Sequence, residues 1–192
     1  LAMAAVGICA PIVTVVTAFT GLLGRGGSPL AAIRMGEGNN QAAERYLGTS
    51  FSMLVLSSLV IMAVTLLFQD PLLTLFGASE NTLGYAREYL TTYILGTVFV
   101  QLTVGMNYYI TTQGFAKTAM VTTMLGGVLN IVIDPVFIFA LGMGVQGAAL
   151  ATVLSQFASF VWVLAFLFGK RTHLKIRKEN LLPRFSVLKE IV

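Results

Sequence analysis

Long uncharged stretches constrain this chain more than any other feature of its sequence. Residues 1–24 and 46–68 contain no Asp, Glu, Lys or Arg, and residues 118–169 contain one charged residue, Asp134. A membrane-spanning helix needs about 20 apolar residues, whereas the strands of a membrane barrel alternate apolar and polar residues over about ten. No such alternation occurs here, and the sequence therefore predicts an all-α integral membrane protein.

Turn-forming residues divide the chain into five predicted membrane-spanning helices. The apolar runs are interrupted at residues 36–40, 70–71, 77–81, 114–117 and 142–144, which are rich in Gly, Pro, Asn and Asp. The predicted helices cover residues 1–23, 46–68, 88–112, 118–141 and 145–168, and a polar tail covers residues 169–192. The first helix is allowed to extend as far as Met35. Since Leu1 already lies in an apolar run that no cation precedes, we expect a piece of a longer protein rather than a secretory signal.

The basic residues predict the orientation of these helices in the membrane. Eleven of the 12 Lys and Arg residues fall on one side, and only Arg87 falls on the other. Cytoplasmic loops carry such an excess of cations, which places residues 25–45, 113–117 and 169–192 in the cytoplasm. We therefore expect a multi-pass protein of the inner (plasma) membrane. We expect the basic tail to be a solvated tether that contacts anionic lipid rather than nucleic acid.

Asp134 is the most informative polar residue, because a carboxylate at membrane depth costs roughly 2.5–3.5 kcal/mol. Asn130 precedes it by one helical turn, so the two side chains share a face about 6 Å apart along the axis. Pro135 removes one backbone hydrogen bond and frees a carbonyl near Ile131. Oxygen atoms grouped in this way suit a hard cation such as Na⁺, or a shared proton. The alternative is structural: Asp134 caps a helix that restarts with Pro135.

The next predicted helix carries small and polar residues at helical spacing. Gly144, Ala148 and Thr152 recur every four residues, and small residues of this kind allow close helix packing in lipid. The Thr152 hydroxyl has a second possible role, since it could reach Asp134 if the two helices form a hairpin. Gln156 continues the stripe by one more turn and is a candidate for the wall of a substrate cavity.

The third predicted helix contains polar and adaptable residues that predict the wall of a substrate cavity. These residues are Gln101, Met106, Asn107, Tyr108 and Tyr109. Methionine and aromatic side chains adapt to varied apolar ligands. Equally, the two tyrosines could form an aromatic belt at the cytoplasmic interface.

Composition excludes several other classes of protein. The chain has one Cys, Cys9, in an apolar run, and one His, His173, in the basic tail, so neither a disulfide framework nor a Cys/His metal site is expected. No Ser/His/Asp or Cys/His catalytic set and no phosphate-binding glycine motif is visible. We therefore expect no enzyme, no metal site and no cofactor apart from a coupling ion.

Two paired motifs resemble the multidrug and toxic compound extrusion (MATE) family, and its bacterial branch most of all. They are Asn130-x-x-x-Asp134-Pro135-x-x-Ile138-Phe139 and Gly144-Val-x-Gly147-Ala-Ala-Leu-Ala-Thr152-Val-Leu-Ser155. Residues 26–29, residues 35–43 and the segment Gln113-Gly114 with Lys117 and Met120 match the family in the same order. The resemblance covers nearly the whole chain.

The resemblance implies a fold and a function that the residues alone do not. Family members have twelve helices in two lobes, so this chain would hold the second to sixth helices and the start of the inter-lobe linker. The family exports cationic and amphipathic drugs in exchange for Na⁺ or H⁺, and its first-lobe cation site matches Asn130, Asp134 and Thr152. The first helix, which carries another Asp of that site, and the second lobe are absent from this chain. Relatives often carry an Arg where Thr111 or Thr112 stands here, which puts the contacts of that Arg in doubt.

Two further functions fit the same composition. A lipid-linked oligosaccharide flippase of the same broad fold would need more cations in its cavity than these helices carry. A non-transporting membrane scaffold subunit would use Asp134 for stability and not for flux. The leading prediction is a secondary active exporter that couples through Asp134 and works by alternating access.

Overall fold

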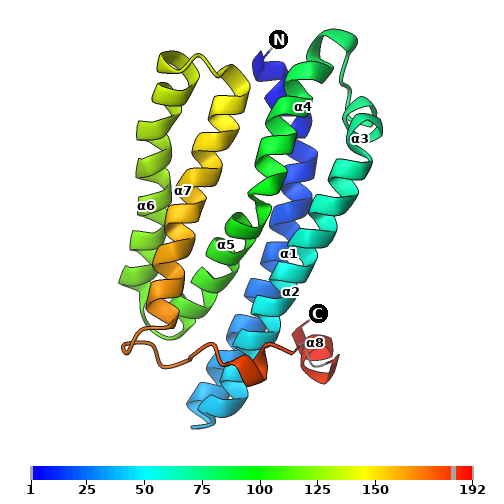
Figure 1. Cartoon of the computed structure of the whole chain (residues 1–192). Coiled ribbons are helices and arrows are strands. Elements are labelled where there is room, and N and C mark those ends of the chain that lie inside the picture. Colours follow the sequence, from blue (N-terminus) through cyan, green and yellow to red (C-terminus); the bar gives the residue numbers. More distant parts are fainter. Residues whose placement is uncertain (1, 183–184, 192) are drawn as a thin grey trace.

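A computed structural model describes residues 2–182 and 185–191, and every regular element in these residues is helical (Figure 1). Residues 1, 183, 184 and 192, which belong to the predicted first helix and tail, lie outside the described residues. The elements are α1 (Ala2–Gly36), α2 (Asn40–Leu67), α3 (Gln69–Leu75), α4 (Glu80–Leu95), α5 (Thr97–Thr112), α6 (Ala116–Pro135), the π-helix η1 (Val136–Ala140), α7 (Gly144–Leu167), the 3₁₀ turn η2 (Lys178–Asn180) and α8 (Phe185–Ile191).

Five membrane-spanning segments can be formed from these helices, as the sequence predicts. Helices α1, α2 and α7, and α6 together with η1, are each long and apolar enough to cross a membrane. The fifth span is the pair α4 and α5, which meet at Gly96 with a bend of 51°. The all-α membrane fold is thus confirmed, although the predicted third span begins too late and lacks this bend.

Gly96, where α4 and α5 meet, lies directly against α7. A Cβ atom at this position would lie 2.3 Å from a methyl carbon of Val153, which no other residue type could accommodate without a shift. The backbone of Gly96 itself is right-handed, so close approach rather than an unusual φ explains the glycine. A glycine inside an apolar run is therefore a packing site here.

The connection before α4 differs from the predicted turn. Residues Asp70 and Pro71 lie in the first turn of the short helix α3, where proline is well tolerated because the first amide groups of a helix have no partner. Arg87 of α4 binds Asp70 through both oxygen atoms of the carboxylate, with one contact of 3.0 Å. The single cation on this side is thus paired with an acid, which reinforces the charge difference between the two faces.

The helices form two groups that α5 joins. The hairpin of α6 and α7 stands on one side of α5, and α1 and α2 stand on the other (Figure 1). Since lipid provides no hydrophobic driving force between helices, close contact has to come from small residues. Gly105 of α5 faces Leu54 of α2, where an added Cβ would lie 2.4 Å from a methyl carbon.

The basic tail is not a solvated tether, contrary to the sequence prediction. Residues 172–182, called the strap below, cross the end of the helix bundle at which α5 and α7 end, and bury Thr172, Leu174 and Asn180. The side-chain oxygen of Gln113 accepts hydrogen bonds from the Thr172 hydroxyl at 2.8 Å and from the backbone amides of His173 and Leu174 at 2.9 Å. These bonds satisfy backbone groups that the strap, which lacks regular structure here, cannot satisfy itself.

A second anchor holds the strap to α2. The buried carboxylate of Glu44 accepts a hydrogen bond from the Lys175 amide at 3.2 Å and forms an ion pair with Arg177 at 2.7 Å. Gly48 lies so close to Asn180 that an added Cβ would come within 2.4 Å of its carbonyl oxygen. The strap is therefore part of the packed structure.

Candidate functional site

Asp134, Asn130 and Thr152 form one polar cluster between α6 and α7. The Asn130 amide nitrogen lies 3.4 Å from an Asp134 carboxylate oxygen and 3.4 Å from the Thr152 hydroxyl oxygen. The Thr152 hydroxyl donates to its own helix, at the Ala148 carbonyl, at 3.0 Å. Asn130 is therefore the centre of the cluster, and Thr152 reaches Asn130 rather than Asp134 as the sequence suggested.

The helix does not restart at Asp134, so the capping alternative does not describe this structure. Helix α6 continues through Asp134 to Pro135, and η1 follows without a turn between them. Pro135 has no N–H group to donate to the carbonyl of Ile131, and π-helical bonding takes over after it. Such π-helical turns often occur at functional sites.

The cluster offers a small cation several oxygen atoms on two helices. A carboxylate, a hydroxyl and the released Ile131 carbonyl are all suitable ligands, and the Asn130 side chain adds an amide oxygen if it turns over. Side-chain amide orientation is assigned from hydrogen bonding, and both orientations place the Asn130 amide group between the other two residues. Loading a cation would thus change the contacts between α6 and α7.

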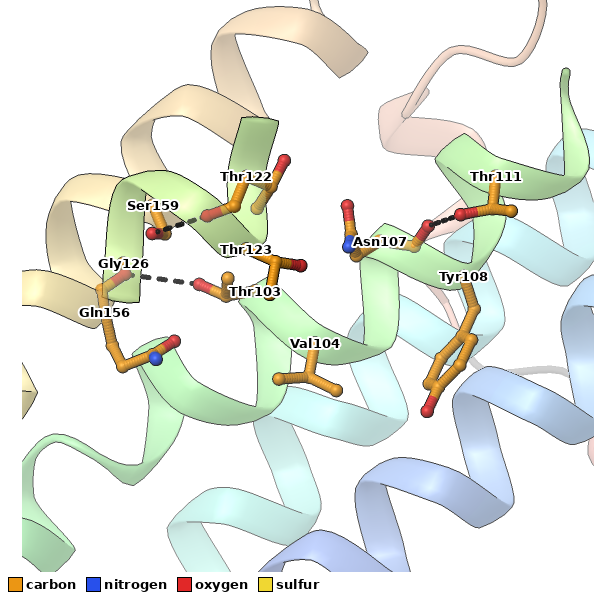
Figure 2. A pocket seen from close by; sticks show the side chains of 10 residues that line it. All are labelled: Thr103, Val104, Asn107, Tyr108, Thr111, Thr122, Thr123, Gly126, Gln156 and Ser159. Carbon is orange, nitrogen blue, oxygen red and sulfur yellow. Dashed lines mark hydrogen bonds between the residues drawn. The ribbon is translucent and has the colours of Figure 1, made fainter. Parts of the chain in front are cut away.

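A polar cavity of about 350 Å³ lies nearer the start of α6, between α5, α6 and α7 (Figure 2). Its lining residues are Thr103, Val104, Asn107, Tyr108, Thr111, Thr122, Thr123, Gly126, Gln156 and Ser159. Hydroxyl groups tie the walls together: Thr103 donates to the Gln156 carbonyl at 3.2 Å, and Ser159 donates to the Thr122 carbonyl at 3.1 Å. Gly126 and Asp134 are separated by roughly 12 Å along α6, from the rise of 1.5 Å per residue.

Three of the six residues predicted for a substrate cavity line this one, and three do not. Asn107, Tyr108 and Gln156 line it, as Figure 2 shows. Gln101, Met106 and Tyr109 are instead fully buried in the packed interior. The Tyr109 hydroxyl lies 2.6 Å from the Ser50 hydroxyl and 3.2 Å from the carbonyl of Tyr46.

Gln101, which was also predicted to line the cavity, instead joins two helices. Gln101 accepts a hydrogen bond from the Ser57 hydroxyl at 2.8 Å, which connects α5 to α2. Gln101 and Tyr109 thus hold α5 against α2 and do not face the cavity. The aromatic-belt alternative for Tyr109 also fails, because its side chain has no exposed surface.

Tyr108 and Arg25 form a contact that the sequence did not reveal. The Arg25 Nε atom donates to the Tyr108 hydroxyl at 2.8 Å, and the guanidinium carbon lies 5.3 Å from the centre of the tyrosine ring. Tyr108 also lines a second cavity of about 600 Å³ between α1 and α5, to which Arg25 contributes. The Arg25 guanidinium of α1 thus lies one helical turn from Thr111 of α5, at the position of Tyr108.

The fold, the cavity and the intramembrane carboxylate together define a helical membrane transport protein. The family model described as MatE matches residues 1–136, and the chain belongs to this family. Family membership agrees with a multi-pass membrane transporter and not with an enzyme.

Curated relatives extend the similarity to the whole chain. The multidrug export protein MepA of Staphylococcus haemolyticus (strain JCSC1435) is 29% identical over 98% of this chain and 42% of its own length. The probable multidrug resistance protein NorM of Thermotoga maritima is 29% identical over 100% of this chain and 42% of its own length. An FAD transporter of Shewanella oneidensis is 25% identical over 95% of this chain and 40% of its own length. The chain thus spans about two fifths of each relative.

Solved structures of MATE transporters show the same helix arrangement. A crystal structure of MATE in the bent conformation has a TM-score of 0.93 and 32% sequence identity, covering 99% of this chain and 43% of that protein. An outward-facing multidrug resistance transporter of the family has a TM-score of 0.90 and 32% identity over 98% of this chain and 42% of its own. The resemblance inferred from the motifs is thereby confirmed.

Proposed function

We propose that this chain forms the first-lobe part of a secondary active multidrug exporter that exchanges Na⁺ or H⁺ for cationic or amphipathic drugs. The observation that carries the proposal is the cluster of Asp134, Asn130 and Thr152 across two helices. Asp134 is the single charged residue in residues 118–169. An intramembrane carboxylate with hydrogen-bonding neighbours is typical of an ion or proton pathway.

The polar cavity supports cationic substrates. None of the 10 side chains that line it is charged, and they supply hydroxyl and amide groups beside aromatic and aliphatic surface. Among the described residues, the amide oxygens of Asn107 and Gln156 are buried without a hydrogen-bond partner. An unsatisfied buried acceptor costs about 1–3 kcal/mol, which a ligand with N–H groups would relieve after a small side-chain rotation.

The uncharged lining also favours an exporter over the oligosaccharide flippase. Recognition of a lipid-linked diphosphate calls for Lys or Arg in the cavity, since these residues are the usual phosphate ligands. The relatives named for export of drugs are consistent with the exporter. One relative is named as an FAD transporter, so the substrates of the relatives are not limited to drugs.

Alternating access requires a lobe that moves as one piece, and two comparisons support this. The chain matches an inward-facing transporter with a TM-score of 0.93 and an outward-facing one with 0.90. It also matches MATE in the bent and the straight conformation, at 0.93 and 0.91. Rocking of one lobe against the other around a site at membrane depth is the usual mechanism of such transporters.

Cation entry supplies the free energy for export in this proposal. Each net unit charge that moves inward down a potential of 100 mV gains about 2.3 kcal/mol, which supports a roughly fiftyfold drug gradient. A one-for-one exchange for a monovalent cationic drug moves no net charge and is driven by the concentration gradient of the coupling cation alone. Binding at Asp134 would change the contacts of Asn130 and Thr152, and so the packing of α6 on α7 beside η1. That packing is the local change that would bias the position of the lobe.

Efflux of a fluorescent cationic dye from cells that express the full-length transporter tests the proposal. We expect Asp134→Asn to abolish efflux while the amount of protein in the membrane is unchanged. The matched control is Asp70→Asn, which removes the carboxylate of the extracellular α3 and should leave efflux intact. Normal efflux by Asp134→Asn would refute the coupling role, and a loss of stability without a specific loss of flux would favour the scaffold alternative.

A further inference from the structure

A groove of about 340 Å³ runs between the cytoplasmic ends of α6 and α7, apart from the substrate cavity. Its lining residues are Phe115, Thr118, Trp162, Ala165, Phe166 and Arg171. None of them lines the polar cavity between α5, α6 and α7. The residues of α7 that face the core, Val163 and Leu167, are fully buried, so the groove opens on another face of that helix.

This face of the hairpin is apolar and exposed. Trp162 is 42% exposed, and the neighbouring apolar side chains Met120 and Phe168 are 57% and 63% exposed. On a membrane-spanning hairpin, exposed apolar side chains suit contact with acyl chains. The excess of cations places the same end of the hairpin at the cytoplasmic interface, where tryptophan is favoured.

The floor of the groove is rigid. The ring of Phe115 packs edge-on against Phe166 with a centroid distance of 5.0 Å, and it stacks on the ring of His173 at 5.2 Å. His173 belongs to the strap, and its amide is bound by Gln113. The groove is therefore built from three separate segments and does not depend on one flexible loop.

Arg171 is held at the rim of the groove by its neighbours in sequence. Directly after it, the buried Thr172 donates to Gln113 at 2.8 Å. Two residues before it, just after the end of α7, the backbone amide of Gly169 donates to the Phe166 carbonyl at 3.0 Å. In residues 2–182 and 185–191 no carboxylate lies within ion-pair distance of Arg171.

We propose that this groove binds one anionic phospholipid of the cytoplasmic leaflet. The Arg171 guanidinium holds the lipid phosphate, because it presents a fork of N–H donors with no competing acid. The Thr118 hydroxyl and the Trp162 ring lie along the path from headgroup to acyl chain. Basic pockets between membrane helices on the cytoplasmic side commonly hold acidic headgroups. Such a lipid would brace the hairpin that carries Asn130, Asp134 and Thr152.

The test uses Trp162, which is the single tryptophan of these residues. The full-length transporter, with any tryptophan elsewhere replaced by Phe, is placed in phosphatidylcholine vesicles that contain a small fraction of a lipid with a brominated acyl chain. Bromine quenches tryptophan fluorescence on contact. We expect brominated phosphatidylglycerol to quench Trp162 at about fivefold lower mole fraction than brominated phosphatidylcholine, the factor for one basic residue at the membrane surface.

Three variants and one competitor decide the outcome. Arg171→Gln should abolish the preference for phosphatidylglycerol, and Arg171→Lys should retain most of it. Lys175→Gln removes an equal charge from the strap outside the groove and should keep the preference in full. Equal quenching by the two lipids, or an unchanged preference in Arg171→Gln, would overturn the proposal. Loss of the preference with excess soluble glycerol phosphate would also overturn it, because the site would then bind a free phosphate.

Discussion

Replacing Gln113 by Leu should release the strap from the end of the helix bundle at which α5 and α7 end. The Gln113 side-chain oxygen accepts three hydrogen bonds from residues 172–174, all of 2.8–2.9 Å. Thr172 keeps a second partner, the Leu174 carbonyl, after the change, whereas the amides of His173 and Leu174 have no other partner in the described residues. At about 1 kcal/mol for each lost bond, the two amides cost about 2 kcal/mol.

Hydrogen exchange of the two amides measures this cost directly. An opening free energy lowered by about 2 kcal/mol corresponds to exchange about thirtyfold faster at His173 and Leu174. Gln113→Glu is the matched control, because a carboxylate offers the same acceptor and should preserve the protection. Unchanged exchange in Gln113→Leu would show that burial of Leu174, and not the hydrogen bonds, holds the strap.

Three further changes test other parts of the structure. Gly96→Ala should destabilise the transporter by about 1–3 kcal/mol in thermal unfolding, because the new Cβ collides with Val153 at 2.3 Å, whereas Gly84→Ala meets nothing within 4 Å and should not. Arg87→Gln should leave the melting temperature unchanged, because the ion pair with α3 is half exposed to solvent. Thr152→Val should weaken the dependence of efflux on the coupling cation and Thr152→Ser should restore it; equal cation dependence in the two variants would remove the Thr152 hydroxyl from the site.

Hydropathy predicted the membrane-spanning helices, because the thickness of the membrane sets their length. The positive charges of the loops predicted their orientation. The break at Gly96 escaped prediction for a physical reason: a glycine in an apolar helix is common in membranes, and its role here depends on Val153 of α7. The short helix α3 was missed because Asp70 and Pro71 suit both a turn and the first turn of a helix.

Spacing predicted that Asn130 and Asp134 share a face, because one helical turn fixes that relation. It could not predict which of them Thr152 meets, because the offset between α6 and α7 is set by packing. Adjacent residues in a helix point about 100° apart, and here Tyr108 lines the cavity whereas Tyr109 is buried in the core. Because this helix is apolar on most sides, the sequence alone does not predict whether Tyr108 or Tyr109 is buried in the core.

The docked strap had no signal in the sequence that periodicity could detect. Its contacts run from side chains of Gln113 and Glu44 to backbone groups of residues 173–175, and any sequence has such groups. The motif that contains Gln113 was recognised through the family resemblance. The structural role of Gln113 is apparent only in the folded protein.

In the proposed function, the cluster around Asp134 couples cation entry to drug export. Full-length transporter reconstituted in vesicles, with an inward Na⁺ or H⁺ gradient and a defined potential imposed, measures this coupling as gradient-driven movement of a cationic drug. We expect the native protein to move drug against its concentration gradient and Asp134→Asn to lose that movement, with the protein folded and correctly inserted. Drug accumulation by Asp134→Asn that still follows the imposed gradient would contradict the account.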